Sequence, residues 1–185
     1  MCFTRNGATI VIFMKHIFLI LFLYPTLLFA QTIENYPRDT SYTIDNAYKK
    51  VVKKYPFVEV AKAEIPKGVA KEAGIVYRNL EGRSLKLDAF YPSKKSEESL
   101  PAVLLIHGGG WRTGDRSLMY PMAAQLAANG FVAVTAEYRL SLEASFPAAV
   151  HDLKAAIEWM RANANKYNID TAKIALLGCS AGGQL

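Results

Sequence analysis

Ser180 is the centre of the most informative pattern in the sequence, Gly-Cys-Ser-Ala-Gly at residues 178–182. The pattern follows the apolar run 174–177, which is typical of a buried strand, so the serine stands where a strand turns sharply into a helix. In such a turn the serine takes a strained backbone conformation, and glycines two residues before and after it leave room for the strand and helix to approach closely. A hydroxyl presented in this way is suited to act as a nucleophile.

A second pattern, His-Gly-Gly-Gly-Trp at residues 107–111, follows the apolar run 102–106. Consecutive glycines can turn their backbone N–H groups toward a bound oxygen, and a reaction that develops a negative oxygen needs such donors. A nucleotide-binding loop is the competing interpretation, but the spacing breaks G-x-G-x-x-G and no Gly-Lys-Ser/Thr follows. The sequence therefore indicates no nucleotide cofactor.

The elements that position these residues begin with a leader at residues 31–73. Within it, the apolar spacing predicts a helix over 44–55, capped by Thr43 and ended by Pro56, whose apolar face packs on the core. Two strands at 74–78 and 84–91 are then expected to form a hairpin.

Strands and helices alternate through the rest of the chain. The predicted order is strand 102–106, helix 118–128, strand 131–135, helix 148–163 and strand 173–177. This alternation predicts an α/β domain with a mostly parallel sheet and helices on both faces. The final strand is expected at an open edge of that sheet.

The first 30 residues carry a targeting signal rather than part of the fold. A short basic start at Met14 is followed by an apolar stretch and a small residue, Ala30, so we expect a signal peptide cleaved after Ala30, with 1–13 as an upstream extension. The protein is then exported, to the periplasm or the medium. The alternative is an uncleaved membrane anchor, because residues 8–13 are also apolar.

Composition excludes few functions once this segment is removed. The remaining residues hold 20 basic and 16 acidic side chains, a net charge of +4. Lysines cluster at 49–54, but they belong to the polar side of the predicted helix 44–55, so we expect no nucleic-acid partner. Cys179 is the single cysteine left, so the processed chain has no internal disulfide, and the His, Cys and Asp positions lack the spacing of a metal site.

Three segments together resemble one family: the glycine loop 107–111, Tyr-Arg-Leu at 138–140, and the turn 178–183. They are similar to the carboxylesterase and lipase branch of the α/β-hydrolase superfamily, close to the hormone-sensitive-lipase-like and acetyl-xylan-esterase-like enzymes. The resemblance covers about residues 74–185. It implies an α/β-hydrolase fold, interrupted after the nucleophile elbow, and hydrolysis of short-acyl esters, including esters of carbohydrates.

The resemblance also implies roles for individual residues. Ser180 is then the nucleophile that forms an acyl-enzyme, and the N–H groups of Gly109, Gly110 and Ala181 hold the oxyanion. Trp111 either lines the acyl or alcohol pocket or packs beneath the loop. His107 is expected to shape the loop by hydrogen bonding, because the catalytic histidine of this family lies far downstream.

Five further residues have structural interpretations. An ion pair between Arg139 and Asp152 would fix the loop between them, and Asp115 would order the turn after the glycine loop. His151 precedes the nucleophile in the chain and is not expected to be catalytic. Cys179 is expected to be a small buried residue beside the serine.

The catalytic set is incomplete in this sequence. In α/β hydrolases the chain order is Ser, then Asp or Glu, then His, and residues 181–185 contain neither partner. We therefore expect the N-terminal part of a longer esterase, inactive as it stands. The alternatives are a serine peptidase of the same fold, or a non-catalytic binding module built on a hydrolase scaffold.

Overall fold

The computed structural model describes residues 39–94 and 96–185, which lie in one compact unit, Glu34–Leu185. The expected signal peptide and its cleavage after Ala30 lie outside the described residues and stay a prediction. Among the helices of the described part, none is long and apolar enough to cross a membrane.

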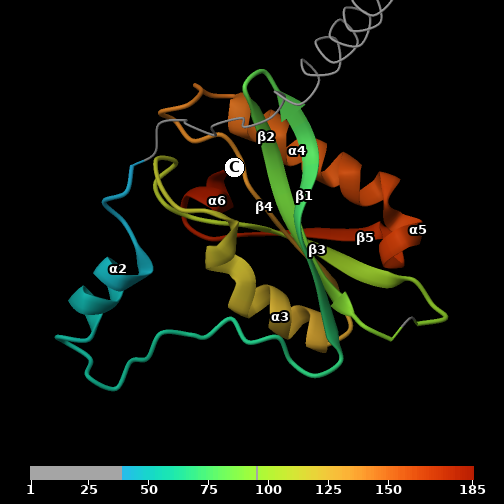
Figure 1. Ribbon diagram of the computed structural model, residues 1–185, viewed down its shortest axis with the longest axis horizontal. Helices are drawn as coiled ribbons and strands as arrows, with labels where there is room; N and C mark the ends of the chain where they lie inside the picture. The colour runs from blue at the N-terminus through green and yellow to red at the C-terminus, as the bar shows by residue number, and fades with distance from the viewer. Residues whose placement is uncertain (1–38, 95) are drawn as a thin grey trace, which may run out of the picture. The chain divides into compact units, whose positions relative to one another are not determined.

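The described residues form one five-stranded sheet with the strand order β1-β2-β4-β3-β5 (Figure 1). The strands are β1 (Val69–Leu80), β2 (Arg83–Pro92), β3 (Leu100–Ile106), β4 (Val132–Ala136) and β5 (Ile169–Gly178). Strand β3 pairs in parallel with both β4 and β5, whereas β2 pairs antiparallel with both β1 and β4. The sheet is therefore mixed, and the expectation of a mostly parallel sheet is wrong for this part of the chain, because the opening hairpin inserts β2 beside β4.

Helices cover both faces of the sheet, as predicted. Helix α4 (Ala148–Ala162) packs Leu153, Ala156 and Met160 against one face, and α3 (Tyr120–Ala128) packs its buried alanines against the other. Strand β3 is buried on both faces, because Leu104 packs in the cluster under α4 and Leu105 packs in the cluster under α3. Its uninterrupted apolar sequence is what burial on two faces requires. Figure 1 shows α3 and α4 on opposite sides of the strands.

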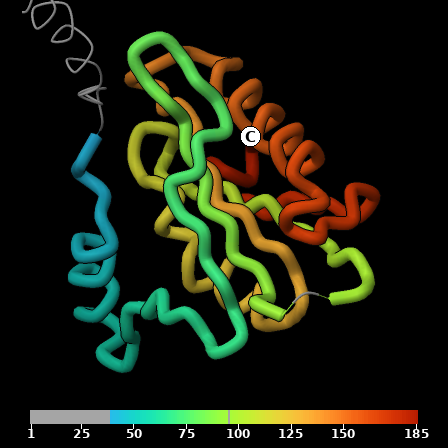
Figure 2. The backbone as a smooth tube through the Cα atoms, turned by 45° about the vertical axis from the view of Figure 1, so that its right-hand side comes forward, coloured from blue at the N-terminus to red at the C-terminus, as the bar shows by residue number. Residues whose placement is uncertain are grey.

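Helix α2 (Ile44–Val51) in the leader departs from expectation. Thr43 does cap it, with Oγ1 accepting from the N–H of Asn46 at 3.1 Å, but the helix ends at Val51, four residues before Tyr55. None of its residues is buried, so the expected packing of its apolar face on the core is wrong. The clusters under α3 and α4 already occupy the two sheet faces, and Figure 2 shows the leader running outside them.

The short elements complete the path of the chain. They are the 3-10 helix η2 (Arg116–Met119), α5 (Ala164–Tyr167) and α6 (Ala181–Gln184). In the parallel pair of β3 and β5, Ile106 lies opposite Gly178. The carboxyl ends of these two strands therefore bring the glycine loop and the serine turn to the same edge of the sheet.

Candidate active site

The turn at Ser180 has the strained geometry that its sequence predicted. Ser180 has φ 52° and ψ −118°, a conformation that non-glycine residues rarely adopt. A Cβ added at Gly178 would lie 2.2 Å from the carbonyl oxygen of Gly182, and one added at Gly182 would lie 2.4 Å from that of Ile106. Both glycines are therefore required by contact with backbone, which fixes the strand, the turn and α6 as one unit.

Gly182→Ala is expected to lower the free energy of unfolding by about 1–3 kcal/mol, because the new methyl group overlaps the carbonyl of Ile106 and the backbone must shift. Gly183→Ala is the matched control. Its Cβ would lie 3.2 Å from the nearest atom, the carbonyl oxygen of Gly178, so a small displacement accommodates it. Urea unfolding of the two variants measures the difference, and equal stability would refute the close contact at Gly182.

The glycine loop is equally dependent on glycine. Gly109 has φ 129°, and a Cβ there would lie 2.1 Å from the carbonyl oxygen of Thr113, while Gly110 has φ 58° with open space beside it. A Cβ on Gly108 would lie 3.2 Å from that of Ser180. The loop thus passes directly beside the serine.

Ser180 opens into a cavity of about 530 Å³ that it shares with this loop. The lining residues are Tyr42, Gly108, Gly109, Gly110, Thr113, Leu118, Met119, Cys179 and Ser180. Ala181 is buried immediately behind the serine. Within the described residues, no acceptor takes the N–H groups of Gly109, Gly110 or Ala181. Donors left open beside a nucleophile are what a developing oxyanion needs.

No Asp, Glu or His is among the residues that line this cavity in the described part of the chain. His107 comes nearest in sequence, but it is buried, and its ring stacks on Tyr138 with centroids 4.4 Å apart. Its Nδ1 lies 2.7 Å from the carbonyl oxygen of Gly108. His107 therefore makes the hydrogen bond within the loop that was expected of it.

Tyr138 is hydrogen-bonded to the first residue of the glycine loop. Its hydroxyl donates to the carbonyl oxygen of His107 at 2.9 Å, and burial raises the pKa of Tyr138 to about 12. A phenol whose pKa is higher in the folded than in the unfolded chain contributes stability below pH 10 and loses it as pH rises toward 12.

We expect Tyr138→Phe to reduce the loss of stability between pH 10 and pH 11, because it removes one group that resists ionisation only in the folded state. At neutral pH the same change should lower the free energy of unfolding by about 1 kcal/mol, for the lost hydrogen bond to His107. Urea unfolding of both proteins from pH 8 to pH 11 tests this. A pH dependence identical to that of the parent chain would contradict it.

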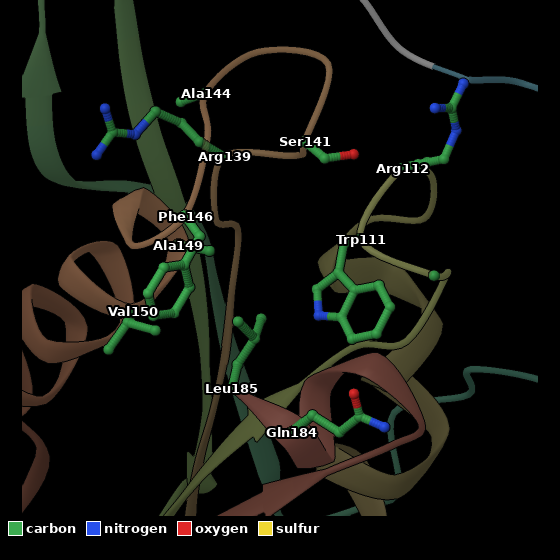
Figure 3. A pocket seen from close by; sticks show the side chains of 11 residues that line it. Trp111, Arg112, Arg139, Ser141, Ala144, Phe146, Ala149, Val150, Gln184 and Leu185 are labelled. Carbon is green, nitrogen blue, oxygen red and sulfur yellow. The ribbon is translucent and has the colours of Figure 1, made fainter.

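Trp111 lines a second cavity, of about 520 Å³, which adjoins the first at Gly110. Trp111 is 40% exposed and has φ 61°, so it does not pack beneath the loop. Figure 3 shows its indole directed into this cavity, opposite Phe146 and near Leu185. Trp111 therefore lines a cavity, and its contact with an acyl or alcohol group stays a prediction.

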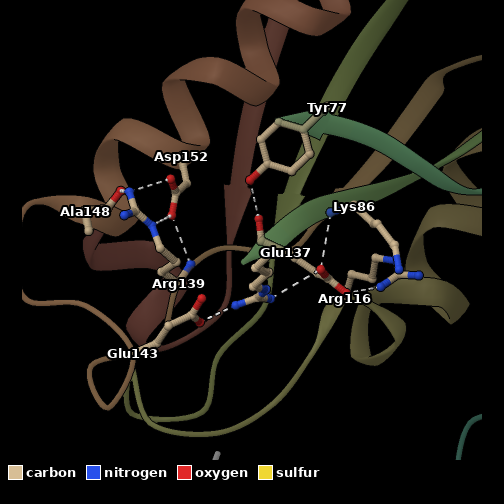
Figure 4. Close-up of polar contacts among 9 residues, drawn as sticks. Tyr77, Lys86, Arg116, Glu137, Arg139, Glu143, Ala148 and Asp152 are labelled. Atoms are coloured by element: carbon tan, nitrogen blue, oxygen red, sulfur yellow. Dashed lines mark hydrogen bonds and ion pairs between the residues drawn. The ribbon is translucent and has the colours of Figure 1, made fainter. Parts of the chain in front are cut away.

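The predicted ion pair between Arg139 and Asp152 is present, and it is part of a cluster that includes a further arginine (Figure 4). Asp152 is fully buried, and its carboxylate accepts from Arg139 Nε and Nη2, both at 2.9 Å, and from the backbone N–H of Arg139 at 3.0 Å. The hydrogen bond to Asp152 raises the pKa of Arg139. Arg78, on β1, also donates to Asp152 at 2.7 Å. No local pattern predicted Arg78 as a third member of this cluster, because it lies 74 residues from Asp152 in the chain.

A second charged cluster, also unforeseen, centres on Glu137 at the end of β4. Glu137 pairs with Arg116 and Arg83, and Arg116 Nε also donates to Asp88 at 2.9 Å. Arg116 begins η2, five residues after the glycine loop ends at Trp111. The cluster therefore ties the exit of the glycine loop to β2 and β4 (Figure 4).

Three smaller expectations have clear outcomes. Asp115 orders the turn after the loop, because its Oδ1 accepts from the N–H of Ser117 at 2.8 Å. His151 is exposed on α4, away from the residues that line the serine cavity. Cys179 was expected to be buried, but it is exposed, because it follows β5, which has a single neighbouring strand in the described sheet. No group of three or more His, Cys, Asp or Glu side chains in the described ranges is placed to hold a metal ion.

The fold, the strained serine and the adjoining glycine loop define an α/β-hydrolase. Residues 87–185 match the BD-FAE family, and the chain belongs to that family. It is 36% identical over 100 residues to Esterase LipC from Mycobacterium tuberculosis, covering 54% of this chain and 25% of that protein. It is 35% identical over 141 residues to an arylesterase from Saccharolobus solfataricus, covering 71% of this chain and 45% of that protein.

Solved structures of esterases also match the chain. Esterase 2 of Thermogutta terrifontis, with propionate bound, is 32% identical with a TM-score of 0.55, over 63% of this chain and 43% of that one. Esterase B from Lactobacillus rhamnosis is 28% identical with a TM-score of 0.60, over 74% and 42%. The chain thus spans less than half the length of these relatives.

Proposed function

We propose that the protein is a carboxylic-ester hydrolase that uses Ser180 as its nucleophile and acts on esters of short acyl groups. One observation carries the proposal: the strained serine and the open N–H groups of the glycine loop share one cavity. The Ser180 hydroxyl attacks the ester carbonyl, the alcohol leaves, and the acyl group stays on the serine until water removes it.

The oxyanion formed in each step is held by the N–H groups of Gly109, Gly110 and Ala181. Loss of one such donor costs on the order of a hundredfold to a thousandfold in rate. The positive φ values at Gly109 and Gly110 support this role, because they allow the loop to turn its backbone inward beside Ser180. Trp111, in the adjoining cavity, contacts the acyl or alcohol group of a larger substrate.

Short acyl groups, including acetyl groups on carbohydrates, are the proposed substrates. The support is the relationship to Thermogutta terrifontis esterase 2, which has been seen with propionate and with butyrate. Hydrolysis of p-nitrophenyl acetate and butyrate by the gene product, without release of nitroaniline from peptide anilides, would support an esterase. The reverse preference would indicate a serine peptidase of the same fold.

A general base is required to activate Ser180, and among the described residues the cavity lining offers no histidine or carboxylate. We therefore propose that residues 1–185 alone do not turn over esters. Steady hydrolysis of p-nitrophenyl acetate by the purified 185-residue chain, abolished by Ser180→Ala, would refute this and would require a base among these residues.

We also propose that the protein is exported, with residues 1–30 removed. The support is the sequence pattern of the basic start, apolar stretch and small residue at Ala30. N-terminal sequencing of the protein recovered outside the cytoplasm should begin at Gln31. A product that retains the segment and sediments with membranes would indicate an anchor instead.

A further inference from the structure

Tyr42 is the one residue from the leader that lines the Ser180 cavity in the described part of the chain. Every other lining residue comes from the glycine loop and the helix that follows it, or from the serine turn. Tyr42 lies more than 60 residues before this loop in sequence, and its side chain is half exposed, at the rim of the cavity. Its position therefore depends on what holds residues 39–43.

The segment 39–43, which we name the strap, is hydrogen-bonded to Arg112 and Thr113, the two residues that follow the glycine loop. At its start, the N–H of Asp39 donates to the carbonyl oxygen of Arg112 at 3.3 Å, and Arg112 Nε donates back to Asp39 Oδ2 at 3.4 Å. Near its end, Thr113 Oγ1 donates to the carbonyl oxygen of Tyr42 at 3.2 Å. Both Arg112 and Thr113 are tied to the glycine loop, because their N–H groups donate to the carbonyl oxygen of Gly109 at 3.2 Å and 3.1 Å.

The strap is also ordered internally. Asp39 Oδ1 accepts from the N–H of Ser41 at 2.8 Å, and this contact with Ser41 holds the pKa of Asp39 below its ordinary value. The carbonyl oxygen of Ser41 accepts from Asn46 Nδ2 at 3.2 Å, and Thr43 caps α2. Tyr42 therefore sits between two locally closed turns rather than on a free tail.

We propose that the strap holds Tyr42 as a wall of the Ser180 cavity, and that Tyr42 limits the size of the acyl group that reaches the serine. The inference rests on the proposed esterase function and adds a residue that sets selectivity. A phenol ring at the rim leaves space for a short acyl group and obstructs a longer one. Removing the ring opens the cavity on the side of the strap, while Ser180 and its N–H donors keep their places.

The first test measures kcat/KM of the full gene product for p-nitrophenyl acetate and p-nitrophenyl octanoate. Tyr42→Ala is expected to raise the octanoate-to-acetate ratio by about tenfold, since fitting even one methylene group into a pocket changes kcat/KM by tenfold or more. The matched control is Tyr55→Ala, which removes a tyrosine of the leader that is 43% exposed, against 51% for Tyr42, and that lines no part of the cavity. An unchanged ratio in Tyr42→Ala would overturn the proposal.

A second readout does not depend on turnover. Cys179 lines the same cavity and is exposed, so its alkylation by iodoacetamide, followed by mass spectrometry of its peptide, reports access to the serine. Tyr42→Ala should speed alkylation and Tyr55→Ala should not. Asp39→Asn should speed it by less than about fivefold, because it weakens one exposed ion pair of the strap.

The two readouts separate failure of the inference from failure of the proposed function. Equal alkylation rates in the parent protein and Tyr42→Ala would overturn the position of Tyr42, whatever the activity. Faster alkylation of Tyr42→Ala in a protein that hydrolyses no ester would support Tyr42 as a wall of the cavity. It would refute the esterase function and the proposed selectivity for acyl length.

Discussion

Ser180→Ala in the active gene product is expected to lower kcat for p-nitrophenyl acetate by on the order of a millionfold, the usual effect of removing the nucleophile of a serine hydrolase. The cavity keeps its shape, because alanine differs from serine only by the hydroxyl. Residual hydrolysis would come from the N–H groups of Gly109, Gly110 and Ala181 acting on substrate attacked by water. Initial rates at saturating substrate measure the loss.

Cys179→Ala is the matched control for this variant. Cys179 lines the same cavity one residue earlier. Its N–H donates to the carbonyl oxygen of Ile106 and its carbonyl oxygen accepts from the N–H of Gly182, and alanine retains both backbone bonds. It should keep kcat within a few-fold of the parent. If Cys179→Ala lost activity and Ser180→Ala did not, the nucleophile would have to be reassigned to the thiol.

Asp152→Ala is expected to lower the free energy of unfolding by about 3 kcal/mol, toward the lower end of the range for breaking a buried ion pair. The change removes a fully buried carboxylate that accepts from Arg139, from the backbone at Arg139 and from Arg78. Both arginine side chains are partly exposed, so they regain some hydration, which keeps the loss below the upper end. Urea unfolding at pH 7 measures it.

Two comparisons make the Asp152 result specific. Arg139→Ala should cost less, because Arg78 remains to neutralise Asp152. Asp45→Ala removes an exposed partner of Lys49 and should change stability by less than about 1 kcal/mol. Equal stability of Asp152→Ala and Asp45→Ala would show that the buried cluster does not stabilise the fold.

More of the candidate site than of the sheet could be predicted from the sequence. The Gly-x-Ser-x-Gly and His-Gly-Gly-Gly patterns encode local backbone demands, positive φ and contact without a Cβ, and the structure meets them at Gly109, Gly178 and Gly182. Such demands depend on residues close in the chain, which is why they can be read in advance.

What the sequence did not provide depends on partners far apart in the chain. The antiparallel pairing of β2 with β4 has no local signal, and neither do the bonds from Arg78 to Asp152 or from Arg116 to Asp88. The amphipathic pattern of α2 suggested burial, but periodicity does not reveal whether a neighbouring surface is already covered. The position of Tyr42 at the cavity also has no local signal, because the strap is placed by hydrogen bonds to Arg112 and Thr113, which are distant in the chain.

Strand β5 has one neighbour in the described sheet, β3. The register of β5 on β3 sets the distance between Ser180 and the glycine loop, while much of β5 is exposed, with Leu176 58% open to solvent. An edge strand with few buried contacts opens at a lower free energy than the whole domain. In the described residues, opening of β5 would separate Ser180 from the glycine loop, so amide hydrogen exchange along β5 should be faster than along β3.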